Sequence, residues 1–299
     1  MKLSFSTLGC YNFKLEDMIK LANKYHIDAL EVRGINDELD NEKILEFDNL
    51  NYQNTISLIK NNGLEFNVLG TSCKFHDEIT YHKYLPKAFK EIDIASKLGF
   101  KAIRIFGNNI INNDSYDYLI NAINILCAYD PNINIYLETH GDFNNHKTLL
   151  PIVNNIKYDN FGLIWDIYHT YRHYQNEFEP FYNCFKPYIK HVHIKDSLND
   201  HPVLFGKGEI DVNKVIKCLT DDRFQGYLSI EWEKKWYDDL EDLEDVLKSF
   251  NDYIKKSYYQ LVTLLLFYFL SLMIAACAAA SLAIGTRYGL QETYVNPTR

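Results

Sequence analysis

The run INIYLETHGD (133–142) is an apolar strand candidate that ends on a carboxylate. Three later runs repeat this arrangement, namely FGLIWDIYHT (161–170), IKHVHIKD (189–196) and GYLSIEWE (226–233). The polar residues at the four strand ends lie 28, 27 and 38 positions apart, and each interval is about one strand plus one helix. A chain that repeats such units can bring its strand ends together on one rim. These end residues are Glu138, Asp166, His193 and Glu231.

Eight apolar runs of this kind occur in the first 256 residues, and amphipathic segments separate them. The runs are β-branched and aromatic and mostly lack strict alternation, which is typical of strands covered on both faces. Eight strand–helix units predict an α/β protein with a (β/α)8 TIM barrel. An open doubly wound sheet is the alternative, but it would spread the four polar ends along an edge. The predicted strands are 3–8, 29–33, 65–70, 102–106, 133–138, 161–166, 189–194 and 226–231.

The segments between these runs carry helix signals. In the predicted helix 15–26 one face is apolar, and the segments 84–99 and 239–254 show similar patterns. Glycine tolerates the left-handed turn that ends a helix, which assigns this role to Gly63, Gly99 and Gly226. Helix N-caps are predicted at Asp114 and Asp211. The apolar face of the first helix consists of Leu15, Met18, Ile19 and Ala22.

The composition limits the function classes. The chain has 299 residues, 47% of them hydrophobic, which is enough for one large domain with a sizeable core. A net charge of −9 argues against a general nucleic-acid binder, which needs a basic face to meet phosphate. The six cysteines form no CxxC pair and indicate buried thiols in a reducing, cytoplasmic compartment.

The C-terminal segment differs from everything before it. Residues 261–285 carry no charge, and a helix of this length would span roughly 37 Å, more than the hydrocarbon core of a membrane. The sequence therefore predicts a barrel over 1–256 and an apolar tail over 257–299 with a candidate transmembrane helix. Lys255 and Lys256 favour a barrel that faces the cytosol and is tethered to the membrane. A helix docked on the domain or on a second subunit, and a non-native extension, stay open as alternatives.

Polar side chains gather at the predicted strand ends, which in a barrel face the active-site mouth. Carboxylates and an imidazole suit one hard or borderline divalent cation, so the four strand-end residues predict a metal site. Single strand-end polar residues are often only solvated or capped, and the inference depends on four metal-competent residues at matching places. Further polar residues near these ends are Glu31, Arg33, His140, His169, Lys195, Asp196 and Glu233.

The motifs LETHGD, WDIYH, HVHIKD, GKGEID and GYLSIEWEKKW, in this order, resemble the xylose isomerase-like barrel superfamily. Within it the likeness is to bacterial sugar phosphate isomerases and epimerases. The resemblance covers Met1 to about Ile254 and excludes the apolar tail. It implies one divalent ion, Mn²⁺, Mg²⁺ or Co²⁺, held by Glu138, Asp166, His193 and Glu231.

The resemblance also implies proton transfer on a sugar or sugar phosphate. In ketose 3-epimerases of this superfamily, two glutamates on opposite faces of the substrate remove and return a proton through a metal-stabilised enediolate. The positions that match these catalytic residues are Glu138 and Glu231. Candidate substrate-binding residues are Arg33, His140, His169 and Lys195, although each could instead pair with neighbouring protein groups.

Other functions stay open on the sequence alone. An inosose dehydratase-like lyase shares the barrel, the metal and the first proton removal. A type IV AP endonuclease-like DNA repair enzyme would need additional histidine ligands, yet GKGEID has none and the third-strand loop offers only His76. A non-catalytic membrane-tethered binding module would have no need for all four ligands. The expected partner is a small-molecule sugar and not nucleic acid, and a homo-oligomer is neither required nor excluded.

Overall fold

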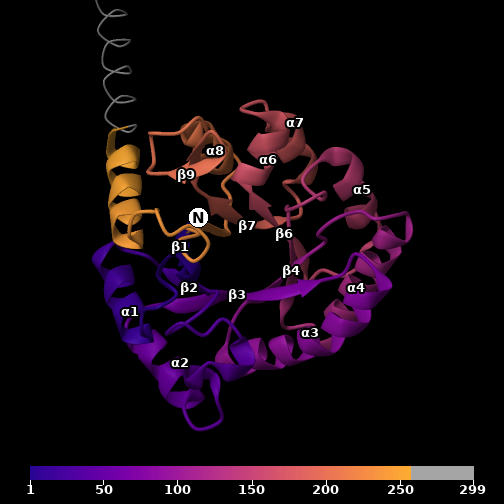
Figure 1. Cartoon of the computed structure of the whole chain (residues 1–299), viewed down its shortest axis with the longest axis horizontal. Coiled ribbons are helices and arrows are strands. Elements are labelled where there is room, and N and C mark those ends of the chain that lie inside the picture. The colour runs from indigo at the N-terminus through magenta and orange to yellow at the C-terminus, as the bar shows by residue number, and fades with distance from the viewer. Residues whose placement is uncertain (257–299) are drawn as a thin grey trace, which may run out of the picture. The chain divides into compact units, whose positions relative to one another are not determined.

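Eight parallel strands close on one another into a barrel. Figure 1 shows this barrel as a cartoon. The computed structural model describes residues 1–256. Closure is direct, because the first strand pairs with both the second and the last, so the open doubly wound alternative is wrong. In chain order the barrel strands are β1 (Lys2–Ser6), β2 (Ala29–Val32), β3 (Glu65–Lys74), β4 (Ala102–Phe106), β5 (Asn134–Glu138), β6 (Phe161–Asp166), β7 (Ile189–Ile194) and β10 (Tyr227–Ile230).

Helices surround the barrel on its outer side (Figure 1). Short 3-10 turns occur at Thr7–Cys10, Asn41–Lys43 and Leu45–Phe47, and a small hairpin of β8 (Asp196–Leu198) and β9 (His201–Val203) follows β7. Residues 243–256 are also helical. The named helices are α1 (Leu15–Lys24), α2 (Tyr52–Asn61), α3 (Glu78–Leu98), α4 (Asp114–Tyr129), α5 (His146–Asn155), α6 (Ile167–Tyr174), α7 (Glu179–Phe185) and α8 (Val212–Asp221).

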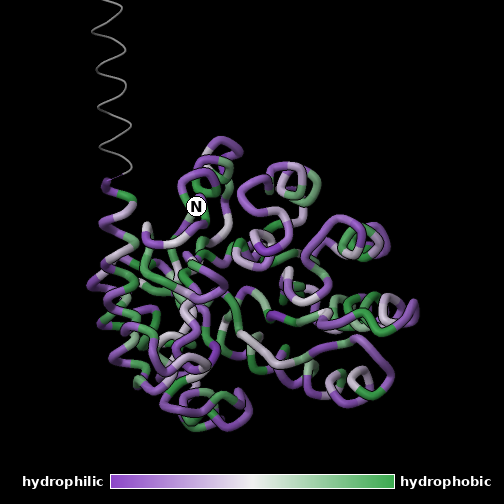
Figure 2. Tube along the Cα trace, turned by 45° about the horizontal axis from the view of Figure 1, so that its top comes forward, coloured by the Kyte–Doolittle hydropathy of each residue, from purple (hydrophilic) through white to green (hydrophobic). Residues whose placement is uncertain are grey.

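The core forms where the apolar stripes of these helices pack on the outer face of the barrel. In Figure 2 the hydrophobic parts of the trace lie mainly toward the interior and the hydrophilic parts outside. The predicted apolar face of α1 is confirmed, because Leu15, Met18, Ile19 and Ala22 are all buried. Burial of such side chains is the main favourable term in folding, at about 1.5–3 kcal/mol for each large apolar residue.

Most predicted helix ends are confirmed, with two exceptions. Gly99 ends α3 with φ +80°, and Asp211 caps α8 by accepting a hydrogen bond from Lys214 N at 3.0 Å. The cap predicted at Asp114 is wrong, because Asn113 precedes the first turn of α4 and makes no side-chain cap. The role predicted for Gly226 is also wrong, since α8 has already ended. A Cβ at Gly226 would lie 2.1 Å from the Lys190 carbonyl oxygen, so glycine is needed there for close backbone approach.

The GKGEID segment (206–211) wraps around one buried carboxylate. Asp196 Oδ2 accepts hydrogen bonds from the backbone N–H groups of Gly206 and Gly208, each at 2.9 Å. Its Oδ1 accepts another from Ile210 N at 3.3 Å. A Cβ at Gly208 would lie 2.0 Å from Asp196 Oδ1, so this glycine makes room for the carboxylate. The segment is therefore a loop organised by Asp196.

Met1–Phe250 forms one compact unit. In the described range, 1–256, no helix has the length and apolar character that a membrane span requires. The tail predicted over 257–299 and its candidate transmembrane helix at 261–285 lie outside the described residues.

Glu91 of α3 is a buried carboxyl group that gives the fold a dependence on pH. Its side chain accepts a hydrogen bond from Asn41 Nδ2 at 2.8 Å, and Lys87 Nζ lies 4.0 Å away. Burial raises the pKa of Glu91 from 4.5 to about 7. The folded chain therefore binds a proton at Glu91 more tightly than the unfolded chain does. This proton binding stabilises the fold at low pH, and the stabilisation is lost as the pH rises from about 4.5, the pKa in the unfolded chain, to about 7, the pKa in the folded chain.

We expect Glu91→Gln to stabilise the protein more at pH 8 than at pH 5, by roughly 2–3 kcal/mol. Glutamine keeps the shape of the neutral side chain and has no proton to lose. Urea unfolding at the two pH values measures the difference. The exposed Glu16→Gln on α1 is the control, and an equal effect of Glu91→Gln at both pH values would contradict the assignment.

Candidate active site

The four predicted strand-end residues meet at one end of the barrel. Glu138 is the last residue of β5, Asp166 is the last of β6, His193 lies within β7, and Glu231 directly follows β10. Each is buried, and one ligand atom from each lies within 4.8 Å of the ligand atoms of the other three. We call these residues the four-donor cluster.

Two atoms of the cluster are buried without a hydrogen bond. They are His193 Nδ1 and Asp166 Oδ2, which lie 3.8 Å apart. His193 Nδ1 also lies 3.3 Å from Glu231 Oε1 and 3.9 Å from Glu138 Oε2. Asp166 Oδ2 has an ion-pair partner in Lys195 Nζ, 3.3 Å away, but His193 Nδ1 faces one carboxylate oxygen from each of the three acidic residues and no donor. An unpaired buried polar atom is costly. The donor set of three carboxylates and one imidazole therefore fits a divalent cation.

A carboxylate outside the four-donor cluster fixes the orientation of His193. Glu31 on β2 lies with Oε1 2.9 Å from His193 Nε2 and with Oε2 2.8 Å from His191 Nε2. Ser229 Oγ donates to Glu31 Oε2 at 2.8 Å. When His193 Nε2–H donates to Glu31, Nδ1 keeps its lone pair toward the four-donor cluster. The sequence placed Glu31 at a strand end, but it did not indicate that Glu31 orients His193. It also did not indicate that His191 and Ser229 contact Glu31.

Two buried cations neutralise the carboxylates of the cluster. Arg104 on β4 lies with Nη1 2.9 Å from Glu138 Oε2 and donates from Nη2 to the Thr71 carbonyl at 3.0 Å. Lys195 Nζ pairs with Glu231 and lies 3.3 Å from Asp166 Oδ2. Lys195 was a predicted substrate-binding residue, whereas Arg104 was not predicted. The signal for Arg104 was a charged residue inside the otherwise apolar run AIRIF (102–106).

The carboxylates of the cluster have different proton affinities. Burial, together with the like charges of Glu138 and Asp166, raises the pKa of Glu231 to about 8 in spite of His193 and Lys195. Burial also favours a higher pKa for Glu138 and Asp166, but nearby positive charges lower the pKa of both by more. Arg104 and His193 hold the pKa of Glu138 below its usual value, and Lys195 holds that of Asp166 well below. Unequal carboxylates in one site suit acid and base roles.

The cluster opens into a cavity of about 180 Å³. Glu138 and Glu231 both line it, so both predicted catalytic residues face the same space. Its apolar lining comes from Leu8, Phe106 and Trp236, and Trp236 is 55% exposed. Three of the predicted substrate-binding residues also line the cavity, namely Arg33, His140 and His169.

His140 and His169 lie side by side in this cavity, with ring centroids 4.2 Å apart. His140 Nδ1 is buried without a hydrogen bond. Burial lowers the pKa of His169 to about 4, so its imidazole is neutral near pH 7. The two rings therefore offer nitrogen atoms that a polar group in the cavity could satisfy.

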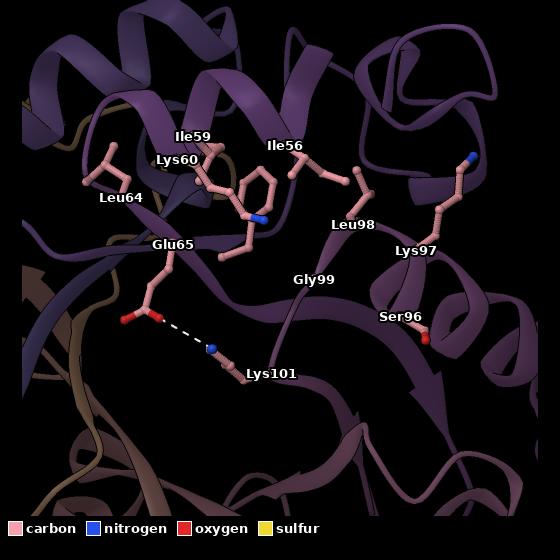
Figure 3. A pocket seen from close by; sticks show the side chains of 11 residues that line it. Ile56, Ile59, Lys60, Leu64, Glu65, Ser96, Lys97, Leu98, Gly99 and Lys101 are labelled. Atoms are coloured by element: carbon pink, nitrogen blue, oxygen red, sulfur yellow. Dashed lines mark ion pairs between the residues drawn. The ribbon is translucent and has the colours of Figure 1, made fainter. Parts of the chain in front are cut away.

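A larger cavity, of about 360 Å³, lies at the opposite, amino-terminal end of the strands (Figure 3). Its lining comes from α2, α3 and the strand starts, and includes an ion pair between Glu65 and Lys101 at 3.5 Å. The lining contains no histidine and only one carboxylate. In barrels of this type, active sites lie at the carboxyl ends of the strands, so the smaller cavity is the candidate active site.

Solved structures with the same fold are numerous, and no curated protein sequence matches the chain significantly. D-allulose 3-epimerase from Methylomonas sp. is 18% identical with a TM-score of 0.69, covering 86% of this chain and 97% of that one. The IOLI protein, solved with a bound zinc atom, is 19% identical with a TM-score of 0.68, covering 86% and 99%. A probable 3-DHS dehydratase, AsbF from Bacillus anthracis, is 14% identical with a TM-score of 0.69, covering 83% and 97%.

At these identities the structural likeness establishes the fold alone. The family is shown by a sequence model described as xylose isomerase-like TIM barrel, which matches residues 19–253. This match spans most of the chain and includes all four residues of the cluster. The chain therefore belongs to the xylose isomerase-like TIM barrel family, as its motifs indicated.

Proposed function

We propose that this protein is a divalent-metal-dependent isomerase or epimerase of a sugar or sugar phosphate. The observation that carries the proposal is the four-donor cluster, in which four metal-competent atoms lie within 4.8 Å of one another and two have no hydrogen bond. Solved proteins of the same fold include enzymes named D-allulose 3-epimerase and D-psicose 3-epimerase, which supports a sugar as substrate.

The residues proposed to hold the ion are Glu138, Asp166, His193 and Glu231. Oxygen-rich sites of this kind suit Mn²⁺, Mg²⁺ or Co²⁺. When bound, a divalent ion at this position would act as a Lewis acid that polarises a carbonyl and stabilises negative charge on neighbouring oxygens. Glu31 would hold His193 in the required orientation through the hydrogen bond to Nε2.

Glu138 and Glu231 are the proposed acid and base. Both carboxylates face the cavity, so a substrate C–H next to a carbonyl could lose its proton to one and receive a proton from the other. Return from the opposite face inverts the carbon, whereas return to the neighbouring carbon moves the carbonyl. Arg104 and Lys195 fix the positions of Glu138 and Glu231 by direct ion pairs. His140 and His169 are proposed to bind substrate hydroxyl groups.

A dehydratase is the second candidate. One solved protein of this fold is named a probable 3-DHS dehydratase, and the first step, proton removal next to a carbonyl, is the same. The unpaired Nδ1 of His140 gives the cavity a further group that could take part in the loss of a hydroxyl. Release of water without solvent exchange into recovered substrate would favour this reading over isomerisation.

A DNA repair nuclease is not favoured. In residues 1–256 the groups able to hold a metal are the four-donor cluster, Glu31 with His191 and His193, and Glu138 with His140 and His169. The third-strand histidine considered for that class, His76, belongs to none of them. It lies instead 3.4 Å from Asp77 and near Asn108.

The full-length protein is expected to incorporate solvent deuterium into a ketose or ketose phosphate when Mn²⁺ is added. The exchange should disappear on chelation and return with fresh metal, because proton removal needs the polarised carbonyl. Mass spectrometry of recovered sugar measures the incorporation. The absence of exchange across a broad panel of sugars at saturating metal would refute the proposed function.

Glu138→Gln and Glu231→Gln should each lower the rate of product formation by roughly 10²–10⁴-fold, since each glutamate is proposed to carry out one proton transfer. In an epimerase with two bases, Glu138→Gln should still exchange the proton of one epimer, and Glu231→Gln that of the other. Deuterium exchange with each pure epimer tests this, with metal content measured in parallel. Loss of exchange with both epimers, in step with lost metal, would show these residues to be ligands only.

Glu31→Gln should weaken Mn²⁺ binding by about 10–100-fold, because a metal-bound histidine depends on the partner of its other nitrogen. Calorimetric titration with Mn²⁺ measures the affinity. Ser229→Ala removes one hydrogen bond to Glu31 and should have a smaller effect in the same direction. Unchanged affinity in Glu31→Gln, with a folded circular dichroism spectrum, would exclude the orienting role.

A further inference from the structure

Arg33 is held at the cavity by several local features. It directly follows β2, and its backbone N–H donates to Thr7 Oγ1 at 2.9 Å. Thr7 Oγ1 in turn donates to the Gly34 carbonyl at 2.7 Å, which fixes the strand end. The side chain then passes over Gly70, where an added Cβ would lie 2.9 Å from Arg33 Cδ. The direction of the guanidinium is thereby set by the fold, and Arg33 as a whole residue is only 9% exposed.

The partners of this guanidinium are neutral. Nη1 donates to the Leu39 carbonyl at 3.2 Å and Nη2 donates to Ser72 Oγ at 2.8 Å. Among residues 1–256, no carboxylate oxygen lies within 4.0 Å of its nitrogens. A buried charge is costly unless it is paired, so Arg33 lacks the group that would offset its burial.

The neighbouring cations show the contrast. Arg104 and Lys195 line the same end of the barrel, and each is in contact with a carboxylate of the four-donor cluster. The carboxylates that contact Arg104 and Lys195 make no direct contact with Arg33. Burial and the like charge of Arg104 lower the pKa of Arg33 to about 10, although the charges of Glu91, Glu138 and Glu231 act in the opposite direction, and the side chain stays protonated near neutral pH. Among residues 1–256, Arg33 is thus a cation at the cavity with no carboxylate in direct contact.

We propose that Arg33 binds an anionic group of the substrate, a carboxylate or a phosphate, and so selects acidic sugars over neutral ones. The planar fork of a guanidinium matches both kinds of anion. The cavity of about 180 Å³ is small for a ligand site, so the substrate is no larger than a single sugar with its acidic group. This inference rests on the proposed function, and it names the class of substrate.

The first test compares three probes that share one carbon skeleton: fructose, fructose 6-phosphate and fructuronate. Deuterium exchange is measured with the full-length, Mn²⁺-loaded protein. The wild type should exchange at least one of the acidic probes about 100-fold more efficiently, in kcat/KM, than fructose. Which acidic probe is preferred distinguishes a phosphate from a carboxylate. Equal or better exchange with fructose would overturn the proposal.

The second test changes Arg33. Arg33→Gln should remove most of the preference for the acidic probe, because it should lower kcat/KM for that probe at least 10-fold more than kcat/KM for fructose. Arg33→Lys, which keeps the charge and loses the fork, should retain part of it. The control Arg223→Gln removes the same charge from an exposed site at the amino-terminal end of β10 and should retain the full preference. An equal loss with fructose and the acidic probe would show that Arg33 is only structural.

A binding measurement separates this proposal from the proposed function. Inorganic phosphate is titrated into the full-length protein purified without added metal, and binding is followed calorimetrically. Arg33→Gln should bind phosphate at least 10-fold more weakly than the wild type or Arg223→Gln. If no sugar exchanges deuterium but this difference appears, the isomerase assignment fails and the anion site stands. If phosphate binding is the same in all three proteins, the anion site is excluded. Should Arg33→Gln not fold, Arg33→Lys carries the comparison, with a smaller loss of phosphate binding because lysine keeps the charge.

Discussion

The parallel register of β6, β7 and β10 determines where the candidate site forms. His193 on β7 pairs with Asp166 on β6 and with Ser229 on β10. Because side chains alternate along a strand, Glu231 follows Ser229 on the same face, two residues later. The same alternation points His191, His193 and Lys195 to one side of β7. A register shift of one residue would turn these side chains to the outer face of the barrel, where the helices pack.

The barrel interior near this end is consequently polar, and its stability depends on internal pairing. Glu31 on β2 contacts His191 and His193 on β7 and Ser229 on β10 in the barrel interior. Each of these groups would be costly to bury alone, and together they satisfy most of one another's hydrogen bonds. His193 Nδ1 and Asp166 Oδ2 of the four-donor cluster have no hydrogen bond, and neither has His191 Nδ1. Two of these three atoms thus belong to the residues that the strand-end pattern singled out.

The barrel and the four-donor cluster could be predicted because both depend on local order along the chain. Strand length, helix periodicity and the residue at each strand end are all visible in the sequence, and AIRIF, FGLIWD and IKHVHI match observed strands residue for residue. The roles of Arg104, Glu31 and Ser229 depend on which strands face one another across the closed barrel. That information appears only when register and closure are known, so sequence patterns identify polar positions but not their partners.

The same limit explains why Arg33 and Lys195 looked alike in the sequence. Both are cations at strand ends, and both have an acidic residue within two positions, Glu31 and Asp196. Neither of these acids is their partner in the structure, because Glu31 is bound to His191 and His193 and Asp196 is bound to its loop. Lys195 instead contacts carboxylates from β6 and from the segment after β10, whereas Arg33 meets only a carbonyl and a hydroxyl. Of the two, Arg33 is therefore the side chain whose charge is left for a bound molecule to neutralise.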